Sequence, residues 1–142
     1  PLLSCVIRIS EGANQRKPVS VVPPDEEAPT DGARAAAVSN LLVRLLAEYT
    51  GRGPTRARTY IHEDLVSVVL QDTLTKGERS LVRDGRASLV LSTRKAYQET
   101  MRDDMVEGVE RIMGRKVMAF LSDNHMEPDV AVESFVLFPA DA

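Results

Sequence analysis

Features that mark membrane-spanning, disulfide-bonded and nucleic-acid-binding proteins are absent from this 142-residue sequence. The longest uninterrupted apolar run, residues 117–121, is far shorter than the ~20 residues of a membrane-spanning helix, so we expect no direct membrane insertion and no ion path within this chain. Its single cysteine, Cys5, excludes an internal disulfide and a cysteine-based zinc site, and it fits a cytoplasmic location. The net charge of −3 argues against a dedicated nucleic-acid binder, since such proteins carry a basic excess.

Aromatic residues are scarce, and prolines are concentrated near the N-terminus. With no tryptophan, three tyrosines and three phenylalanines, the core must consist mainly of leucine, valine, isoleucine and methionine. Five of the eight prolines lie within residues 1–32, which we interpret as a flexible leader, although residues 2–9 suit a strand if another strand pairs with them. We assign the folded domain to residues 33–138 and a short tail to residues 139–142.

Hydrophobic periodicity predicts three helices and four strands in the folded part. Apolar residues recur at helical spacing over residues 33–50, and Gly51 then provides a left-handed stop. Thr75 and Glu78 match a capping box for a short helix that ends near residue 83, and a longer helix follows over about residues 86–113. Alternating and β-branched stretches predict strands over residues 55–61, 65–71, 116–122 and 130–137.

The order of these elements indicates the fold class. Helix, β-hairpin, two helices and β-hairpin predict an α+β fold, in which a four-stranded antiparallel sheet packs against helices. Both hairpins leave a strand edge exposed, and exposed edges often pair with another copy of the chain. On that ground we hypothesise a homodimer.

One group of arginines is the best candidate for a binding site. Arg56 and Arg58 share a strand face with Tyr60, and Arg52 and Gly53 lie in the turn just before that strand. Planar guanidinium groups bind the paired oxygens of carboxylate, bicarbonate or phosphate, and glycine lets an anion approach the backbone. The alternative is a solvated strand face beside a helix-terminating turn, which is the commoner role of such charge runs.

Other polar residues are weaker candidates. Arg94 lies on the same side of the long helix as Val90 and Met101, where it either pairs with a carboxylate or extends to the surface, and the general behaviour of arginine favours the surface. His62 and His125 lie in hairpin loops near acidic residues and would form a metal cluster only if both loops faced the same end of the sheet. We predict no catalytic residue, no metal site and no cofactor.

Several short elements occur together, in order, in residues 33–138. They are residues 48–54 (EYTGRGP), residues 58–61 (RTYI), Leu74-Thr75 with Glu78, Arg94 in a long helix that ends at Gly114, Lys116-Val117, and Ser122-Asp123. In this combination the chain resembles the MpsC-like family, named for a sodium-translocating, membrane-potential-generating system. The leader lies outside the resemblance.

The resemblance implies a small bacterial protein linked to a cation-translocating membrane system, and it transfers no catalytic residue. We therefore expect a non-enzymatic accessory or regulatory component, which is cytoplasmic or held at the inner membrane by transporter subunits. The alternative is a regulatory domain that binds a small anion or nucleotide through the arginine-rich strand face. A third hypothesis is a small hydrolase or metalloenzyme, but few catalytic side chains in the sequence are expected to lie together in one site.

Overall fold

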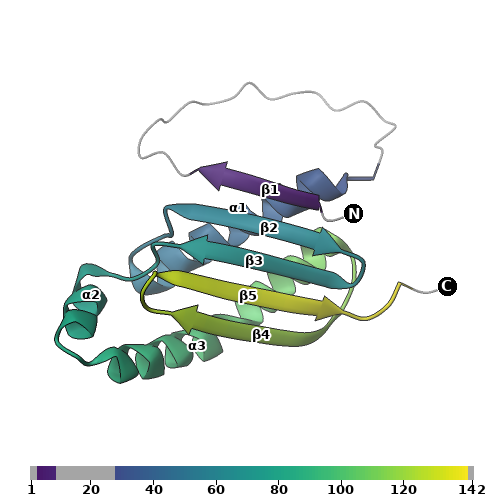
Figure 1. The fold of residues 1–142 in the computed structure, drawn as a ribbon. Helices are drawn as coiled ribbons and strands as arrows, with labels where there is room; N and C mark the ends of the chain where they lie inside the picture. The colour runs from purple at the N-terminus through teal and green to yellow at the C-terminus, as the bar shows by residue number, and fades with distance from the viewer. Residues whose placement is uncertain (1–2, 9–27, 141–142) are drawn as a thin grey trace.

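The computed structural model describes residues 28–140 and the backbone of residues 3–8 (Figure 1). Along the chain the elements are β1 (Leu3–Arg8), α1 (Asp31–Thr50), β2 (Arg56–His62), β3 (Leu65–Gln71), α2 (Lys76–Arg83), α3 (Ala87–Met113), β4 (Val117–His125) and β5 (Val130–Leu137). Helices pack against an antiparallel sheet, so the predicted α+β fold class is confirmed.

The strands of the sheet are all antiparallel to their neighbours and follow the order β1-β2-β3-β5-β4. The four predicted strands are present, and β1 extends the sheet by pairing with β2. β4 continues past residue 122 to His125 because its pairing with β5 continues to Val130. Residues 9–27 of the predicted leader lie outside the described residues, so its flexibility stays a prediction.

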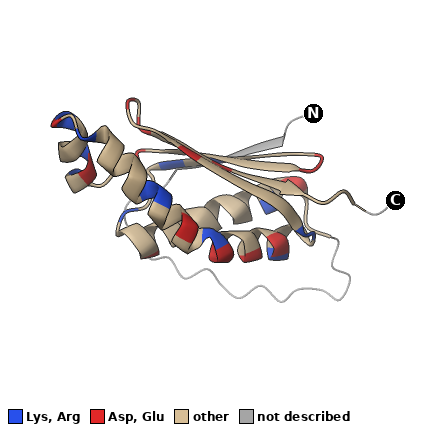
Figure 2. Ribbon diagram, turned by 90° about the horizontal axis from the view of Figure 1, so that it is seen from below, with Lys and Arg blue, Asp and Glu red and all other residues tan. Residues whose placement is uncertain are grey.

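Helices α1 and α3 cover one face of the sheet, and no described element covers the other face (Figure 2). The strands alternate accordingly, because every second residue of β2, β3 and β5 is buried toward the helices. The core that results is aliphatic and methionine-rich, with Phe135 as a central ring. This composition agrees with the scarcity of aromatic residues in the sequence.

α1 begins two residues before the predicted start at residue 33, because Thr30 caps it, and it ends at Gly51 as predicted. The Oγ1 atom of Thr30 accepts a hydrogen bond of 3.1 Å from the amide of Ala33, and Gly51 ends the helix with a φ of 78°. On the buried side of α1, the hydroxyls of Ser39 and Thr59 lie 2.6 Å apart. These two polar groups therefore satisfy each other between the helix and the sheet.

α1 and α3 approach closely at a glycine. A Cβ atom added to Gly108 of α3 would lie 2.4 Å from a terminal methyl of Leu41 on α1. Glycine inside a helix costs about 1 kcal/mol relative to alanine. The close contact of the two helices is the structural reason for a glycine at this position.

Arg94 joins α3 to α2 through a buried ion pair. The predicted capping box of Thr75 and Glu78 begins α2, and both carboxylate oxygens of Glu78 also accept hydrogen bonds from Arg94, at 2.8 and 2.9 Å. Arg94 donates a third bond, of 2.6 Å, to the carbonyl of Thr73 and is only 3% exposed. The prediction that Arg94 extends to the surface is therefore wrong. Its guanidinium is buried because the Glu78 carboxylate and the Thr73 carbonyl accept its hydrogen bonds.

Glu78 is held in its charged form by these contacts. Partial burial raises the pKa of its carboxyl, but the hydrogen bonds from Arg94 and Thr75 outweigh that effect and hold the pKa below its ordinary value. The ion pair is thus charged near neutral pH.

We predict that Arg94→Met lowers the free energy of unfolding by about 3 kcal/mol or more, since it leaves the Glu78 carboxylate partly buried without its counter-charge. Urea denaturation followed by circular dichroism measures the change. Lys95→Met, at an exposed position one residue along the same helix, is the matched control and should change stability by less than about 0.5 kcal/mol. Equal stabilities of the two variants would contradict this role of Arg94.

Candidate functional site

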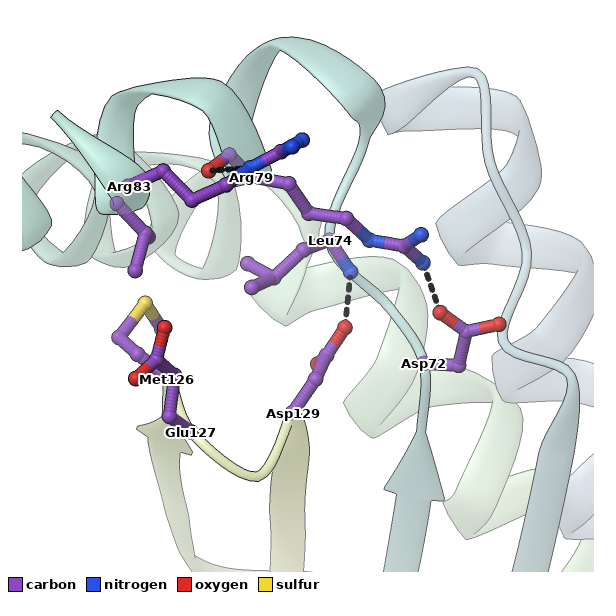
Figure 3. A pocket seen from close by; sticks show the side chains of 8 residues that line it. Asp72, Leu74, Arg79, Arg83, Met126, Glu127 and Asp129 are labelled. Atoms are coloured by element: carbon purple, nitrogen blue, oxygen red, sulfur yellow. Dashed lines mark hydrogen bonds and ion pairs between the residues drawn. The ribbon is translucent and has the colours of Figure 1, made fainter.

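A hollow of about 290 Å³ lies between α2 and the turn that joins β4 to β5 (Figure 3). Side chains from three parts of the chain meet here, and both charged and apolar groups line the space. They are Asp72, Leu74, Arg79, Val82, Arg83, Met126, Glu127 and Asp129. Because five of these eight residues are charged, we consider first how those groups are paired.

Asp72 is the centre of charge pairing at this hollow. It follows β3 with a φ of 59°, a left-handed conformation that aspartate tolerates better than most residues. One oxygen of its carboxylate accepts a hydrogen bond of 2.7 Å from Arg52, and the other oxygen accepts from Arg79. The carboxylate therefore links the end of α1 to α2. About a third of each side chain is exposed, so solvent screens these pairs and their net contribution to stability is modest.

Asp129 holds the segment between β3 and α2. Its carboxylate accepts hydrogen bonds from the Thr73 hydroxyl at 3.1 Å and from the Leu74 amide at 2.9 Å, while its carbonyl accepts from the Asp72 amide at 3.1 Å. Two carboxylates at the wall of the hollow thus fix the backbone and neighbouring arginines. We assign this hollow a structural role in placing α2.

The predicted arginine site is divided in the structure. Arg56, Arg58 and Tyr60 lie on the face of β2 that points away from the helices, where they line a hollow of about 80 Å³ together with Val69 and Gln71. Arg58 donates a hydrogen bond of 2.9 Å to the Tyr60 hydroxyl. Among the described side chains, no carboxylate forms an ion pair with Arg56 or Arg58.

Arg52 and Gly53 lie in a different place from the strand arginines. They line a separate hollow at the end of α1, and the Arg52 guanidinium is already paired with Asp72. The structure thus groups three of the five predicted residues, and their role in binding an anion stays a prediction. No local motif marks Asp72 as the partner of Arg52, because the two residues are 20 positions apart in sequence.

The two histidines do not come together. His62 pairs with Leu65, whereas His125 pairs with Val130, and the register of β3 with β5 places these pairs at opposite ends of the sheet. Within the described part of the chain, no group of three or more His, Cys, Asp or Glu residues is arranged to hold a metal ion.

Glu133 is a carboxyl group buried between the sheet and α3. It lies on β5 at 1% exposure, and its Oε1 atom accepts a long hydrogen bond of 3.4 Å from Gln98 of α3. Burial raises the pKa of Glu133 to about 7, and the nearby Ser122 hydroxyl, the Gln98 amide and the charge of Arg94 only partly oppose that effect. Sequence reasoning missed Glu133. Its spacing of two residues from Phe135 could have placed it on the core face of β5, but acidic residues are seldom buried.

The fold and these contacts define a small α+β domain with an antiparallel sheet, one face of which is covered by the described helices. The family model described as "Na+-translocating membrane potential-generating system (MpsC)" matches residues 30–138, and the chain belongs to this family. The resemblance seen in the sequence is thereby confirmed.

One curated relative adds a name without a function. The chain is 28% identical over 100 residues to the uncharacterized protein YrhF of Bacillus subtilis (strain 168), in a match that covers 69% of this chain and 82% of the relative. No solved structure gives a significant match. In the described part of the chain, no helix has the length and apolarity to cross a membrane.

We predict that Glu133 makes the protein less stable as the pH rises from about 4.5 to 7. In this range the folded state keeps a proton on Glu133 that the unfolded state has released, so the stabilisation present at low pH is lost as the pH passes the folded-state pKa. Relative to Glu133→Gln, the wild type should lose about 3 kcal/mol between pH 4.5 and pH 8.

Urea denaturation at a series of pH values measures this difference. Glu127→Gln, in the turn before β5, is the control and should follow the wild type at every pH. If the stability difference between wild type and Glu133→Gln is independent of pH, Glu133 has an ordinary pKa and the prediction is wrong.

Proposed function

We propose that this chain is a non-catalytic accessory component of a Na+-translocating, membrane-potential-generating system. The observation that carries the proposal is the family match, which extends from the N-cap of α1 to the residue after β5 and so covers the domain apart from β1. The family description names a membrane process. We therefore place the protein in the cytoplasm, at the inner membrane, with a membrane-embedded subunit of that system as its partner.

The end of the molecule formed by α2 and the first turn of α3 is the proposed contact with that subunit. Figure 1 shows α2 beyond the ends of the strands, and none of its residues is fully buried. Beside it, Leu89 and Leu91 at the start of α3 are 50% and 40% exposed. The two leucines are two positions apart and so project to different sides of α3, and each is a large exposed apolar side chain that a contact with another protein would cover.

The arrangement of charged groups supports a role without catalysis. Asp72 and Asp129 at the hollow beneath α2 accept hydrogen bonds from arginines and from the backbone, and Glu78 is paired with Arg94. A general acid or base needs a polar atom free to reach a substrate. These carboxylates instead hold loops and helices in place.

Binding of a small anion is the second candidate function. One observation favours it, namely that Arg56 and Arg58 line a hollow in which no described carboxylate neutralises them. Bicarbonate, phosphate or the phosphate groups of a nucleotide match the fork of donors that a guanidinium offers. In this alternative the anion would regulate the domain.

We predict that the tagged full chain, captured from gently solubilised membranes of its source organism, brings with it a multi-pass cation-transporting subunit identified by mass spectrometry. Leu89→Glu should lower the recovery of that subunit at least about tenfold, because it places a charge in an apolar contact. Thr100→Glu, an exposed position on the same helix, adds the same charge and should leave recovery unchanged. Absence of any membrane protein from the capture would contradict the proposed function.

The anion alternative predicts a thermal shift. At ten times its dissociation constant, phosphate or bicarbonate would stabilise the folded state by about 1.4 kcal/mol, which corresponds to about 4 °C in Tm. The double variant Arg56→Ala, Arg58→Ala should lose this shift, whereas Lys95→Ala, Arg111→Ala, with the same change of charge at exposed helix positions, should keep it. No shift in the wild type would remove the alternative.

A further inference from the structure

The uncovered face of the sheet, which we call the open face, carries an ordered pattern of charge. One row of residues directly opposite one another crosses the sheet, from Val6 on β1 to Arg58 on β2, Val69 on β3, Val132 on β5 and Asp123 on β4. Residues opposite one another on neighbouring strands project from the same face. Over its last four strands, from β2 to β4, the row is therefore basic at β2, apolar at β3 and β5, and acidic at β4.

The middle of the open face is suited to burial. Val69 and Val132 are only half-buried in the chain alone, and in the next row the hydroxyls of Ser67 and Ser134 lie 2.9 Å apart. These hydroxyls already satisfy each other, so covering them leaves no unpaired polar group. Leu121, at the β4 side of the same row, is 58% exposed.

The charges at the two sides of the face are without opposite partners among the described side chains. Neither Arg58 nor Asp123 takes part in an ion pair in the described part of the chain. They lie in the same row with two strands between them, Asp123 on the edge strand β4 and Arg58 on β2, next to β1. Each is therefore available to a charge on another molecule.

Symmetry shows which molecule fits this pattern. If two copies meet face to face about a two-fold axis parallel to the strands and midway between β3 and β5, β2 of each copy lies over β4 of the other. Arg58 then meets the partner subunit's Asp123, and Val69 meets the partner subunit's Val132, while a two-fold axis across the strands would instead bring Arg58 onto itself. A self-complementary patch of this kind is what a two-fold interface requires.

We infer that the open face is a homodimer interface, in which Arg58 of each copy pairs with Asp123 of the partner subunit around a centre of valines and paired serines. This goes beyond the proposed function and uses a different surface from the end of α2 and α3. It also differs from the homodimer hypothesised from strand edges, in which Arg58 and Asp123 would remain apart.

The size of the open face indicates a weak dimer. Four strands spaced about 4.8 Å apart, with seven residues at about 3.4 Å each, give roughly 460 Å² of projected area per copy. Two copies together bury roughly 900 Å², just below the ~1,000 Å² expected of a stable specific interface. Contacts of this size are typically weak and transient, so we expect a dissociation constant in the micromolar range.

Charge reversal tests the proposal in the full-length chain. Sedimentation equilibrium from about 1 to 300 μM should show a monomer–dimer equilibrium for the wild type, and Arg58→Asp or Asp123→Arg alone should weaken it at least about tenfold, because like charges then face each other. The double variant Arg58→Asp, Asp123→Arg should restore dimerisation to within about threefold of the wild type. Arg111→Asp, on the helix-covered side, is the charge control, and circular dichroism checks that each variant is folded.

Every other outcome overturns the inference. A wild type that is monomeric throughout this range means that another molecule, or residues 9–27 of the same chain, occupies the open face or that nothing does. If neither single charge reversal changes the dissociation constant of the dimer, strand edges or helices form the contact. Weakening without rescue in the double variant means that Arg58 and Asp123 do not pair. These experiments measure self-association of the purified chain and need no membrane partner. Their outcome therefore does not depend on whether the proposed function is correct.

Discussion

The packing of α1 and α3 on one face of the sheet is the constraint on which the other contacts depend. It requires apolar side chains at alternate positions of the strands and close contact between the helices, as at Gly108 and Leu41. Polar groups that fall on this face must find partners between the layers, and the hydroxyls of Ser39 and Thr59 do so. Glu133 is less fully satisfied, since one of its carboxylate oxygens has no partner, and its burial raises its pKa to about 7.

Local sequence patterns predicted the helices, four of the strands and their caps, because those signals act over a few residues. Thr75 and Glu78 are three positions apart, and Gly51 ends α1 through its own backbone conformation. The partner of β1 was left open, since the strand that pairs with it, β2, comes about fifty residues later in the chain.

The contacts that place the candidate sites act over longer distances and could not be predicted in this way. Arg52 forms an ion pair with Asp72, which lies 20 positions away in sequence, and this pairing keeps Arg52 apart from the arginines of β2. Arg94 meets Glu78 across 16 positions, so its burial depends on where α2 lies against α3. Such pairs carry no fixed spacing in sequence, and only the packed structure brings them together.

The two proposals, taken together, make this chain a small domain that acts through contacts with other proteins. In the account proposed above, the helix-covered face supplies stability, the end formed by α2 and α3 contacts a membrane-embedded subunit, and the open face contacts a second copy. In this account the arginines of β2 recognise a carboxylate on another chain. A small anion would compete with that carboxylate for the same guanidinium groups.

The central claim is that the open face forms a symmetric contact, and isotope-filtered nuclear Overhauser spectroscopy on a mixture of labelled and unlabelled chains tests it most directly. The account predicts intermolecular contacts between the methyl groups of Val69 in one copy and those of Val132 in the other, with Leu121 of one copy close to Tyr60 of the other. Intermolecular contacts confined to helices or strand edges, or none at concentrations of several hundred micromolar, would contradict it.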